Sequence, residues 1–113
     1  MSNQNARFFN IEDIQRQRTQ QAIAYLEFLR IPSMSAGVYV LARGSADLQS
    51  PHLQDEVYYV IRGKARMRAG SEDQSVQVGS VIFVAAHAEH RFYDIEEELT
   101  VLVFFSPAET EGA

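Results

Sequence analysis

His52 and Glu56 lie four residues apart and form the part of the chain best suited to chemistry. This even spacing places both side chains on one face of an extended strand, together with Gln54 and Tyr58. A carboxylate that faces the inside of a small domain loses its hydration, which is costly unless a cation or hydrogen bonds compensate the charge. A divalent metal ion would compensate it, so the pair indicates part of a metal site.

A third ligand should come from a distant segment, and His90 is the natural candidate. It opens an apolar segment directly after an expected turn over residues 85–89. The chain has no cysteine, so any metal must be held by nitrogen and oxygen ligands. The same residues leave a second interpretation open, in which no metal binds and Glu56 is hydrogen-bonded to both histidines.

The segments that would carry these residues are short, apolar and rich in β-branched and aromatic side chains. Turn-forming residues separate them, and no crossover helices are visible between them, so an all-β sandwich or barrel is favoured. The expected strands are residues 25–29, 37–41, 57–61, 65–68, 75–78, 81–85, 90–94 and 99–105. We expect Phe83, Phe92 and Phe104 to contribute to the core.

The N-terminal segment has a different pattern. Asn10 is a good helix N-cap with acidic residues behind it, but the following stretch QRQRTQQ has no apolar stripe. We therefore expect a short helix or ordered arm within residues 1–24. A chain of 113 residues leaves little room for a second core, so residues 25–108 should form a single barrel domain and residues 109–113 a flexible tail.

Charge and composition argue against several classes of protein. The net charge is -5, whereas proteins that bind nucleic acids carry basic patches, so no nucleic-acid partner is expected. One basic cluster stands at every second position of an expected strand: Arg62, Lys64, Arg66 and Arg68. If Ala65, Met67 and Ala69 face the core, these charges face water. The alternative is that one arginine reaches a carboxylate ligand.

Neither a secretory signal nor an apolar run long enough to span a bilayer is visible, so we expect a cytoplasmic protein with no membrane partner. The stretches VYYVI and LTVLVFF are apolar on both faces, and each must therefore bury two faces. We predict a homodimer in which the partner subunit covers the outer face. Coverage by the N-terminal arm is the alternative.

The spacing around His52 resembles the first motif of the cupin superfamily. That motif consists of a Gly, five residues, His-x-His, three or four residues, a Glu, six residues and a Gly. The matching residues are Gly44, Ser50, His52, Glu56 and Gly63. Ser50 stands where the family has its first His, which removes one of the usual metal ligands.

A second stretch resembles the other cupin motif, which consists of a Gly, five residues, Pro-x-Gly, two residues, a His, three residues and an Asn. The matching residues are Gly79, Ala85, His87, His90 and Asp94. The family's Gly at position 87 suggests a turn with a positive φ, which His tolerates better than most residues. We expect His87 to be a loop residue rather than a ligand.

The resemblance implies a small cupin β-barrel of the RmlC-like, jelly-roll type, also called a double-stranded β-helix. It implies that His52, Glu56 and His90 hold one divalent ion, while Ser50 leaves a fourth position to water or ligand. Fe(II), Mn, Ni, Zn and Cu are all compatible with such ligands. Ser50, Gln54 and Phe92 are expected around the pocket.

The resemblance also suggests a function. Two imidazoles and one carboxylate are the set that non-haem Fe(II) sites use, so we expect a dioxygenase-like, metal-dependent enzyme that acts on a small organic molecule. Glu56 and Tyr58 would be catalytic residues that assist proton movement. Isomerase and lyase chemistry stay open, because the fold does not select the reaction. The alternatives are a non-catalytic module that binds a metabolite or metal, and a structural dimer with a vestigial site.

Overall fold

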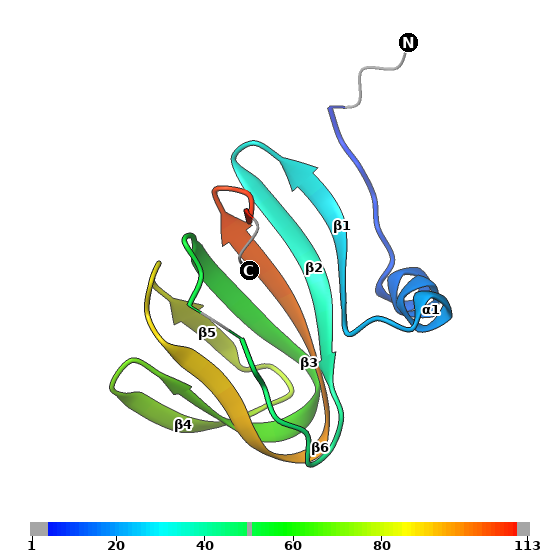
Figure 1. Cartoon of the computed structure of the whole chain (residues 1–113). Coiled ribbons are helices and arrows are strands. Elements are labelled where there is room, and N and C mark those ends of the chain that lie inside the picture. Colours follow the sequence, from blue (N-terminus) through cyan, green and yellow to red (C-terminus); the bar gives the residue numbers. More distant parts are fainter. Residues whose placement is uncertain (1–4, 50, 111–113) are drawn as a thin grey trace.

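A computed structural model describes residues 5–49 and 51–110, and its main feature is a strongly curved antiparallel sheet with an N-terminal helix at one side (Figure 1). The elements are α1 (Ile11–Gln21), β1 (Tyr25–Ile31), β2 (Met34–Leu41), β3 (Asp55–Ala69), β4 (Glu72–Gln77), β5 (Val81–Val84) and β6 (His90–Ser106). The strand order is β1-β2-β6-β3-β4, and β5 also pairs with β3. The expected all-β fold with a short N-terminal helix is confirmed.

Two strands are longer than the sequence pattern predicts. β3 joins the expected strands 57–61 and 65–68, and β6 joins 90–94 and 99–105, so the division into separate strands is wrong at both places. The register between β3 and β6 shifts three times between Val60 and Arg66, and such bulges let a strand bend without ending. Gly63 lies in this bend at φ +101, where a Cβ atom would stand 2.2 Å from the carbonyl oxygen of Glu98. Only glycine therefore allows this close strand crossing.

The basic cluster of β3 faces away from the core. Ala65 and Met67 are buried, with 4% of each exposed, and the charged residues alternate with them. Arg66 and Arg68 each lie 3.1 Å from a carboxylate oxygen of Asp73 on β4. Of the two interpretations of this cluster, the structure supports the one with charges on the outside, because both arginines pair with a surface carboxylate.

The helix α1 covers one part of the outer face of the sheet. The Asn10 side chain accepts a hydrogen bond from the backbone NH of Glu12 at 2.9 Å, which confirms the expected N-cap. Ile14 then packs with Leu26 and Val38 in a small second core beneath the helix. The N-terminal segment thus buries the outer side of β1 and β2 and reaches Leu102 of β6, but it leaves Tyr59 of β3 40% exposed, so the alternative of coverage by the arm is not met for the stretch VYYVI. No helix among the described residues is long and apolar enough to cross a membrane.

A second part of the outer face, beside the charged cluster of β3 and β4, is apolar and open. Cross-strand pairs place five side chains there, which we call the outer patch: Val57, Tyr59, Val81, Phe83 and Phe104. Phe83 is 63% exposed, so its assignment to the core is wrong. The reason is the alternation along β5, in which Val84 points inward and leaves Phe83 outside. Phe92 is fully buried as expected, and Phe104 is half-buried.

Candidate metal centre

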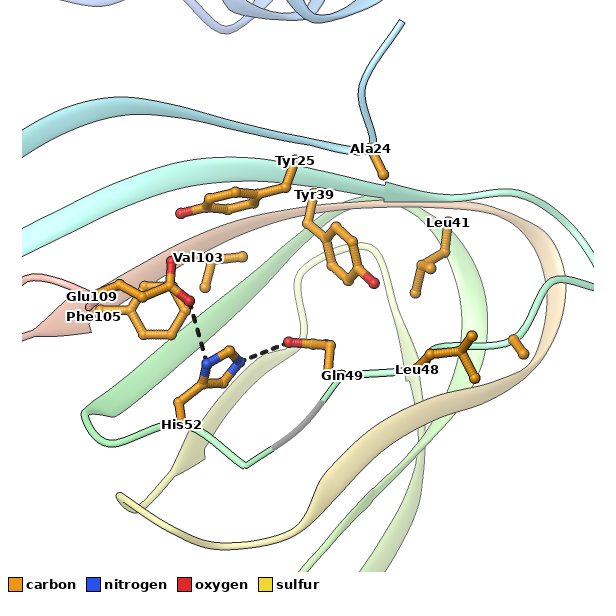
Figure 2. Close-up of a pocket in the computed structure, with 11 residues that line it drawn as sticks. Ala24, Tyr25, Tyr39, Leu41, Leu48, Gln49, His52, Val103, Phe105 and Glu109 are labelled. Atoms are coloured by element: carbon orange, nitrogen blue, oxygen red, sulfur yellow. Dashed lines mark hydrogen bonds and ion pairs between the residues drawn. The ribbon is translucent and has the colours of Figure 1, made fainter. Parts of the chain in front are cut away.

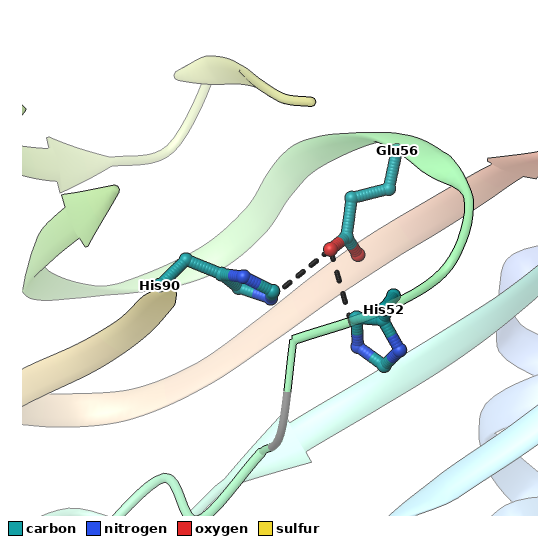
Figure 3. A group of neighbouring side chains, drawn as sticks. All are labelled: His52, Glu56 and His90. Carbon is teal, nitrogen blue, oxygen red and sulfur yellow. Dashed lines mark ion pairs between the residues drawn. The ribbon is translucent and has the colours of Figure 1, made fainter. Parts of the chain in front are cut away.

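His52, Glu56 and His90 meet on the inner side of the sheet (Figure 3). Glu56 lies near the start of β3, His90 is the first residue of β6, and His52 lies in the segment that leads into β3. All three are buried, with 2% to 7% of each residue exposed. One possible ligand atom from each lies within 4.8 Å of the others, so these residues could hold a metal ion.

The atoms that face one another lack ordinary partners. His90 Nε2 lies 3.0 Å from Glu56 Oε1, and His52 Nε2 lies 3.9 Å from the same oxygen. These separations suit ion pairs, yet His90 Nε2 and both Glu56 oxygens are buried without a partner in hydrogen-bond geometry. Leaving such atoms unpaired is costly, and a divalent cation between them would satisfy all three. The donor set therefore fits a metal ion better than a network centred on Glu56.

The backbone orients His90 for this role. Its Nδ1 lies 3.0 Å from the carbonyl oxygen of Ala88, which can only accept a hydrogen bond, so Nδ1 carries a proton and Nε2 faces Glu56. Burial alone would lower the pKa of His90, but Glu56 and the Ala88 carbonyl outweigh it, and the pKa is raised. A metal would have to compete with a proton for Nε2, so acid should weaken its binding.

His52 is held from three sides. Its Nδ1 lies 3.3 Å from Glu109 Oε2 and its Nε2 lies 2.9 Å from Gln49 Oε1 (Figure 2). Its ring also packs edge-on against Phe105 at a centroid distance of 4.9 Å. The backbone NH of His87 donates to the His52 carbonyl oxygen at 2.7 Å. These contacts fix the ring with Nε2 on the side of Glu56.

Gln49 and Asp47 connect this centre to the surrounding strands. Asp47 is 6% exposed, and its carboxylate accepts hydrogen bonds from the Tyr39 hydroxyl at 3.0 Å, the Gln49 amide at 3.0 Å and the Phe92 backbone NH at 2.9 Å. Sequence reasoning missed both residues. They lie in the irregular stretch ADLQSPH, where no periodicity indicates which side chains turn inward.

Tyr58 and Phe92 lie where strand parity places them. Tyr58 is fully buried, and its hydroxyl donates to Gln49 Oε1 at 3.2 Å. Burial and the nearby Glu56 carboxylate raise the pKa of Tyr58 well above its usual value. The Phe92 ring packs edge-on against the Tyr58 ring with 5.0 Å between centroids. Both residues thus form the wall behind the three candidate ligands.

Gln54 is buried, and its amide is directed to the end of the chain. Its Nε2 donates to Thr110 Oγ1 at 2.9 Å. Glu109 is also held, because its backbone NH donates to Ser35 Oγ at 2.8 Å and its carbonyl accepts from the Arg30 guanidinium at 2.5 Å. The expected flexible tail is therefore corrected for Glu109 and Thr110, which fold back onto the barrel. Residues 111–113 and the predicted pocket residue Ser50 lie outside the described residues.

His87 behaves as the sequence predicts. Its φ is 69, which confirms the expected positive value, and its side chain is exposed in the turn before β6. It belongs to no cluster of possible ligands among the described residues. Its contribution to the site is the backbone hydrogen bond to His52.

A pocket of about 530 Å³ opens beside His52 (Figure 2). Its walls are mainly apolar and come from β1, β2, β6 and the stretch before β3. The larger lining side chains are Tyr25, Tyr39, Leu41, Leu48, Val103 and Phe105, with Gln49, His52 and Glu109 as the polar ones. This volume is in the range of small-molecule sites, which lie between about 300 and 1,000 Å³.

Comparison with known proteins agrees with this architecture. An uncharacterized protein of Streptomyces coelicolor is 45% identical over 102 residues, which are 90% of this chain and 97% of that protein. The structure of TT1209 from Thermus thermophilus matches with a TM-score of 0.70 and 21% identity over 89% of this chain and 97% of that one. The structure of the DMSP lyase DddQ from Ruegeria pomeroyi DSS-3 matches with a TM-score of 0.63 and 19% identity.

That last match covers 67% of this chain but only 39% of the lyase, and structural matches at such identities show the fold alone. The family model described as "Cupin domain" matches residues 37–106, which include both motifs and all three candidate ligands. Because this match covers more than half of the sequence, the chain belongs to the cupin family, as a small single-domain member.

Proposed function

We propose that this cupin is a metal-dependent enzyme that acts on a small organic molecule, with one divalent ion held by His52, Glu56 and His90. The observation that carries this proposal is the convergence of three buried side chains, with atoms that lack partners, next to a pocket of about 530 Å³. The bound ion would supply Lewis-acid or oxygen-activating chemistry with positions open to substrate.

Within this proposal, Glu56 and Tyr58 assist proton movement. The raised pKa of Tyr58 keeps its hydroxyl protonated at neutral pH, so it holds a proton at its oxygen rather than acting as a base. Glu56 has two buried oxygens, and one of them can stay free to accept a proton or a hydrogen bond. The apolar walls of the pocket limit the access of water to these groups.

Dioxygenase chemistry is our preferred reaction class because two imidazoles and one carboxylate leave coordination positions open. Lyase or isomerase chemistry is the nearest alternative, and one protein of similar fold is a lyase by name. A non-catalytic module that binds a metabolite or metal is the second candidate function. The same apolar pocket supports it.

The proposal is tested with protein purified without a polyhistidine tag, in which metal per chain is measured by elemental analysis. We expect about one ion per chain in the native protein, loss of that ion in His52→Ala and His90→Ala, and retention in the matched control His87→Ala. Oxygen uptake by the Fe(II) form with thiols, phenols and keto acids would support dioxygenase chemistry. Stoichiometric metal without turnover of any compound would favour the binding module.

We further propose that the protein forms a homodimer through the outer patch, because α1 leaves Phe83 and Val81 63% and 67% exposed. A sheet face of this kind is a liability in a monomer. Sedimentation equilibrium should give twice the 12.8 kDa chain mass for the native protein and a single chain for Phe83→Glu. A monomeric native protein would refute this proposal.

The cytoplasmic location and the assignment of residues 25–108 to one domain stay predictions.

A further inference from the structure

The charges around the pocket beside His52 disfavour anionic ligands. Among the described residues that line it there is no lysine or arginine, whereas Glu109 is there with its carboxylate 3.3 Å from His52. Burial raises the pKa of Tyr25 and of Tyr39, so both phenols stay neutral at physiological pH. The Arg30 guanidinium influences Tyr25, but it does not line the pocket and is paired with the Glu27 carboxylate. An anionic ligand would thus find no guanidinium or ammonium group in the lining and would face a carboxylate.

One hydroxyl in this pocket lacks a partner. The Tyr25 hydroxyl is buried without a hydrogen bond, and Glu109 is the charge that influences it most. The ring reaches this place by lying across Gly37, where a Cβ atom would stand 2.4 Å from its outer ring atoms. Leaving a buried hydroxyl unsatisfied is unfavourable, and a polar group of a ligand would satisfy it.

The remaining walls are apolar. Leu41, Leu48, Val103 and Phe105 surround the space between Tyr25 and His52 (Figure 2). Such walls favour a molecule that buries mostly carbon, with few polar groups to desolvate. The volume of about 530 Å³ leaves room for a ring with short substituents.

We propose that this pocket takes an uncharged, ring-sized and largely apolar molecule with one hydroxyl or carbonyl group, which forms a hydrogen bond with Tyr25. The proposal deepens the proposed function and rests on it, because it names the class of molecule that is presented to the metal site. It also predicts that organic anions such as carboxylates and phosphates are disfavoured in the pocket.

The test uses benzyl alcohol and benzoate, two probes with the same ring and different charge. Binding is followed by amide chemical shifts of the metal-free protein, so that no carboxylate can bind through an ion. We expect benzyl alcohol to bind in the roughly millimolar range normal for so small a ligand, and benzoate at least about tenfold more weakly.

Substitutions in and beside the pocket test whether Tyr25 binds the probe. Tyr25→Phe and Gly37→Ala, which displaces the Tyr25 ring, should weaken benzyl alcohol binding by about fivefold or more, since a lost hydrogen bond costs about 1 kcal/mol. Tyr59→Phe on the outer face is the matched control and should bind normally. Equal binding of both probes, binding of neither, or an unchanged Tyr25→Phe overturns the proposal. The proposed function is tested separately, by the metal content of the protein.

A second, independent observation concerns Gln49. Its Oε1 lies 2.9 Å from His52 Nε2 and 3.2 Å from the Tyr58 hydroxyl. The amide cannot easily turn round, because its Nε2 donates to Asp47 Oδ2 at 3.0 Å. The carbonyl oxygen, rather than the nitrogen, is therefore held next to the ring nitrogen that faces Glu56.

The spacing of these atoms suits neighbouring ligands of one ion. When two ligand atoms each lie about 2.1 Å from an octahedral ion and the ligand–ion–ligand angle is a right angle, the two atoms are about 3.0 Å apart. The 2.9 Å between Gln49 Oε1 and His52 Nε2 agrees with this value, and so does the 3.0 Å between His90 Nε2 and Glu56 Oε1. Side-chain amide oxygens are accepted ligands for divalent ions.

We infer that Gln49 Oε1 is a fourth protein ligand of the proposed metal site, in a sequence that lacks the motif's first His at position 50. The inference rests on the proposed site. It assigns a role to one of the five unspecified residues of the first motif, one position before the place where a ligand is expected.

Metal affinity, measured by competition with a chromogenic chelator, tests this inference, with the visible spectrum of the Co(II) form as a second readout. Gln49→Ala should lower the affinity by about 10- to 100-fold and change the Co(II) spectrum. Gln49→Glu, which keeps an oxygen ligand, should bind as tightly as the native protein or more tightly. Gln54→Ala removes another buried amide and serves as the control.

The outcomes separate the two claims. Native affinity in Gln49→Ala, together with loss of metal in His52→Ala, overturns the role of Gln49 and leaves the site intact. Equal weakening in Gln49→Ala and Gln49→Glu indicates a structural role and also overturns it. A native protein that binds no metal overturns both the inference and the proposed function.

Discussion

Each candidate histidine ligand is oriented by a contact on the side of its ring that faces away from the centre. For His90 this contact is the Ala88 carbonyl oxygen at 3.0 Å, and for His52 it is Glu109 at 3.3 Å. Such partners set the tautomer and raise the basicity of the ligating nitrogen. Glu109 is thus a positioning residue, contributed by the segment after β6.

Glu109→Ala should weaken metal binding by about tenfold or more, because His52 loses the carboxylate that lies 3.3 Å from its outer nitrogen. Glu109→Gln retains an oxygen that can accept from the same nitrogen and should restore much of the affinity. Isothermal titration of the metal-free variants with Zn(II) measures both. If the two variants bind equally well and as tightly as the native protein, Glu109 does not position His52.

At the residue level, the sequence predicts the residues that lie on regular strands or in motifs. Parity places Glu56 and Tyr58 on one face, and spacing adds His52 and His90. Asp47, Gln49 and Glu109 could not be predicted, because they reach the site from irregular segments by long-range contacts. Tyr25 was missed for a related reason, since its role depends on a glycine in the neighbouring strand.

At the level of elements, the long strands β3 and β6 bring the ligands together. Both are bent by register shifts and continue across positions where the sequence suggests a break. Gly63 and residues 95–98 fall between expected strands in the sequence, whereas tertiary pairing makes both segments part of continuous strands, with register shifts between β3 and β6. The sequence predicts the positions at which β3 and β6 deviate from regular pairing. It does not predict that each strand continues on the other side of these positions.

Gly63→Ala tests this bend. We expect a loss of roughly 1–3 kcal/mol from the positive φ and a similar further loss from the clash with the Glu98 carbonyl. Gly70→Ala is the matched control, since φ is +58 there but nothing lies within 4 Å of the added Cβ, so only backbone strain of about 1–2 kcal/mol should appear. Urea unfolding measures both, and equal losses would contradict the close crossing.

The outer side of β3, β4 and β6 carries a polar cluster that should respond to acid. The Tyr93 hydroxyl donates to Asp73 at 2.6 Å, and Arg68 and Arg66 also bind this carboxylate. Together they lower the pKa of Asp73 below its usual 3.8, although burial opposes them. Because the pKa of Asp73 is lower in the folded protein than in the unfolded chain, the cluster stabilises the fold at pH values above the unfolded pKa. This stabilisation is lost as the pH falls from the unfolded pKa through the folded pKa.

The difference in unfolding free energy between the native protein and Asp73→Asn should therefore be constant above about pH 5 and shrink below about pH 4. Urea unfolding at a series of pH values measures it. Parallel curves for Asp73→Asn and the native protein down to pH 3 would show that the cluster does not hold the carboxylate.

At the level of the whole molecule, the two faces of the barrel carry different features. The inner face presents the candidate ligands and the pocket, while the outer face carries the part under α1, the open outer patch and the charged cluster around Asp73. The helix covers β1 and β2 and reaches β6 only at Leu102, so a partner subunit is proposed for the outer patch. The barrel by itself does not select a reaction, so the functional argument depends on the centre.

The most direct test is a crystal structure with anomalous diffraction data collected at the absorption edge of the metal that elemental analysis finds. The account predicts one anomalous peak per chain, about 2.0–2.3 Å from His52 Nε2, His90 Nε2 and a Glu56 oxygen. The absence of a peak in crystals grown from metal-supplemented protein, or a peak that touches none of these three residues, would contradict it.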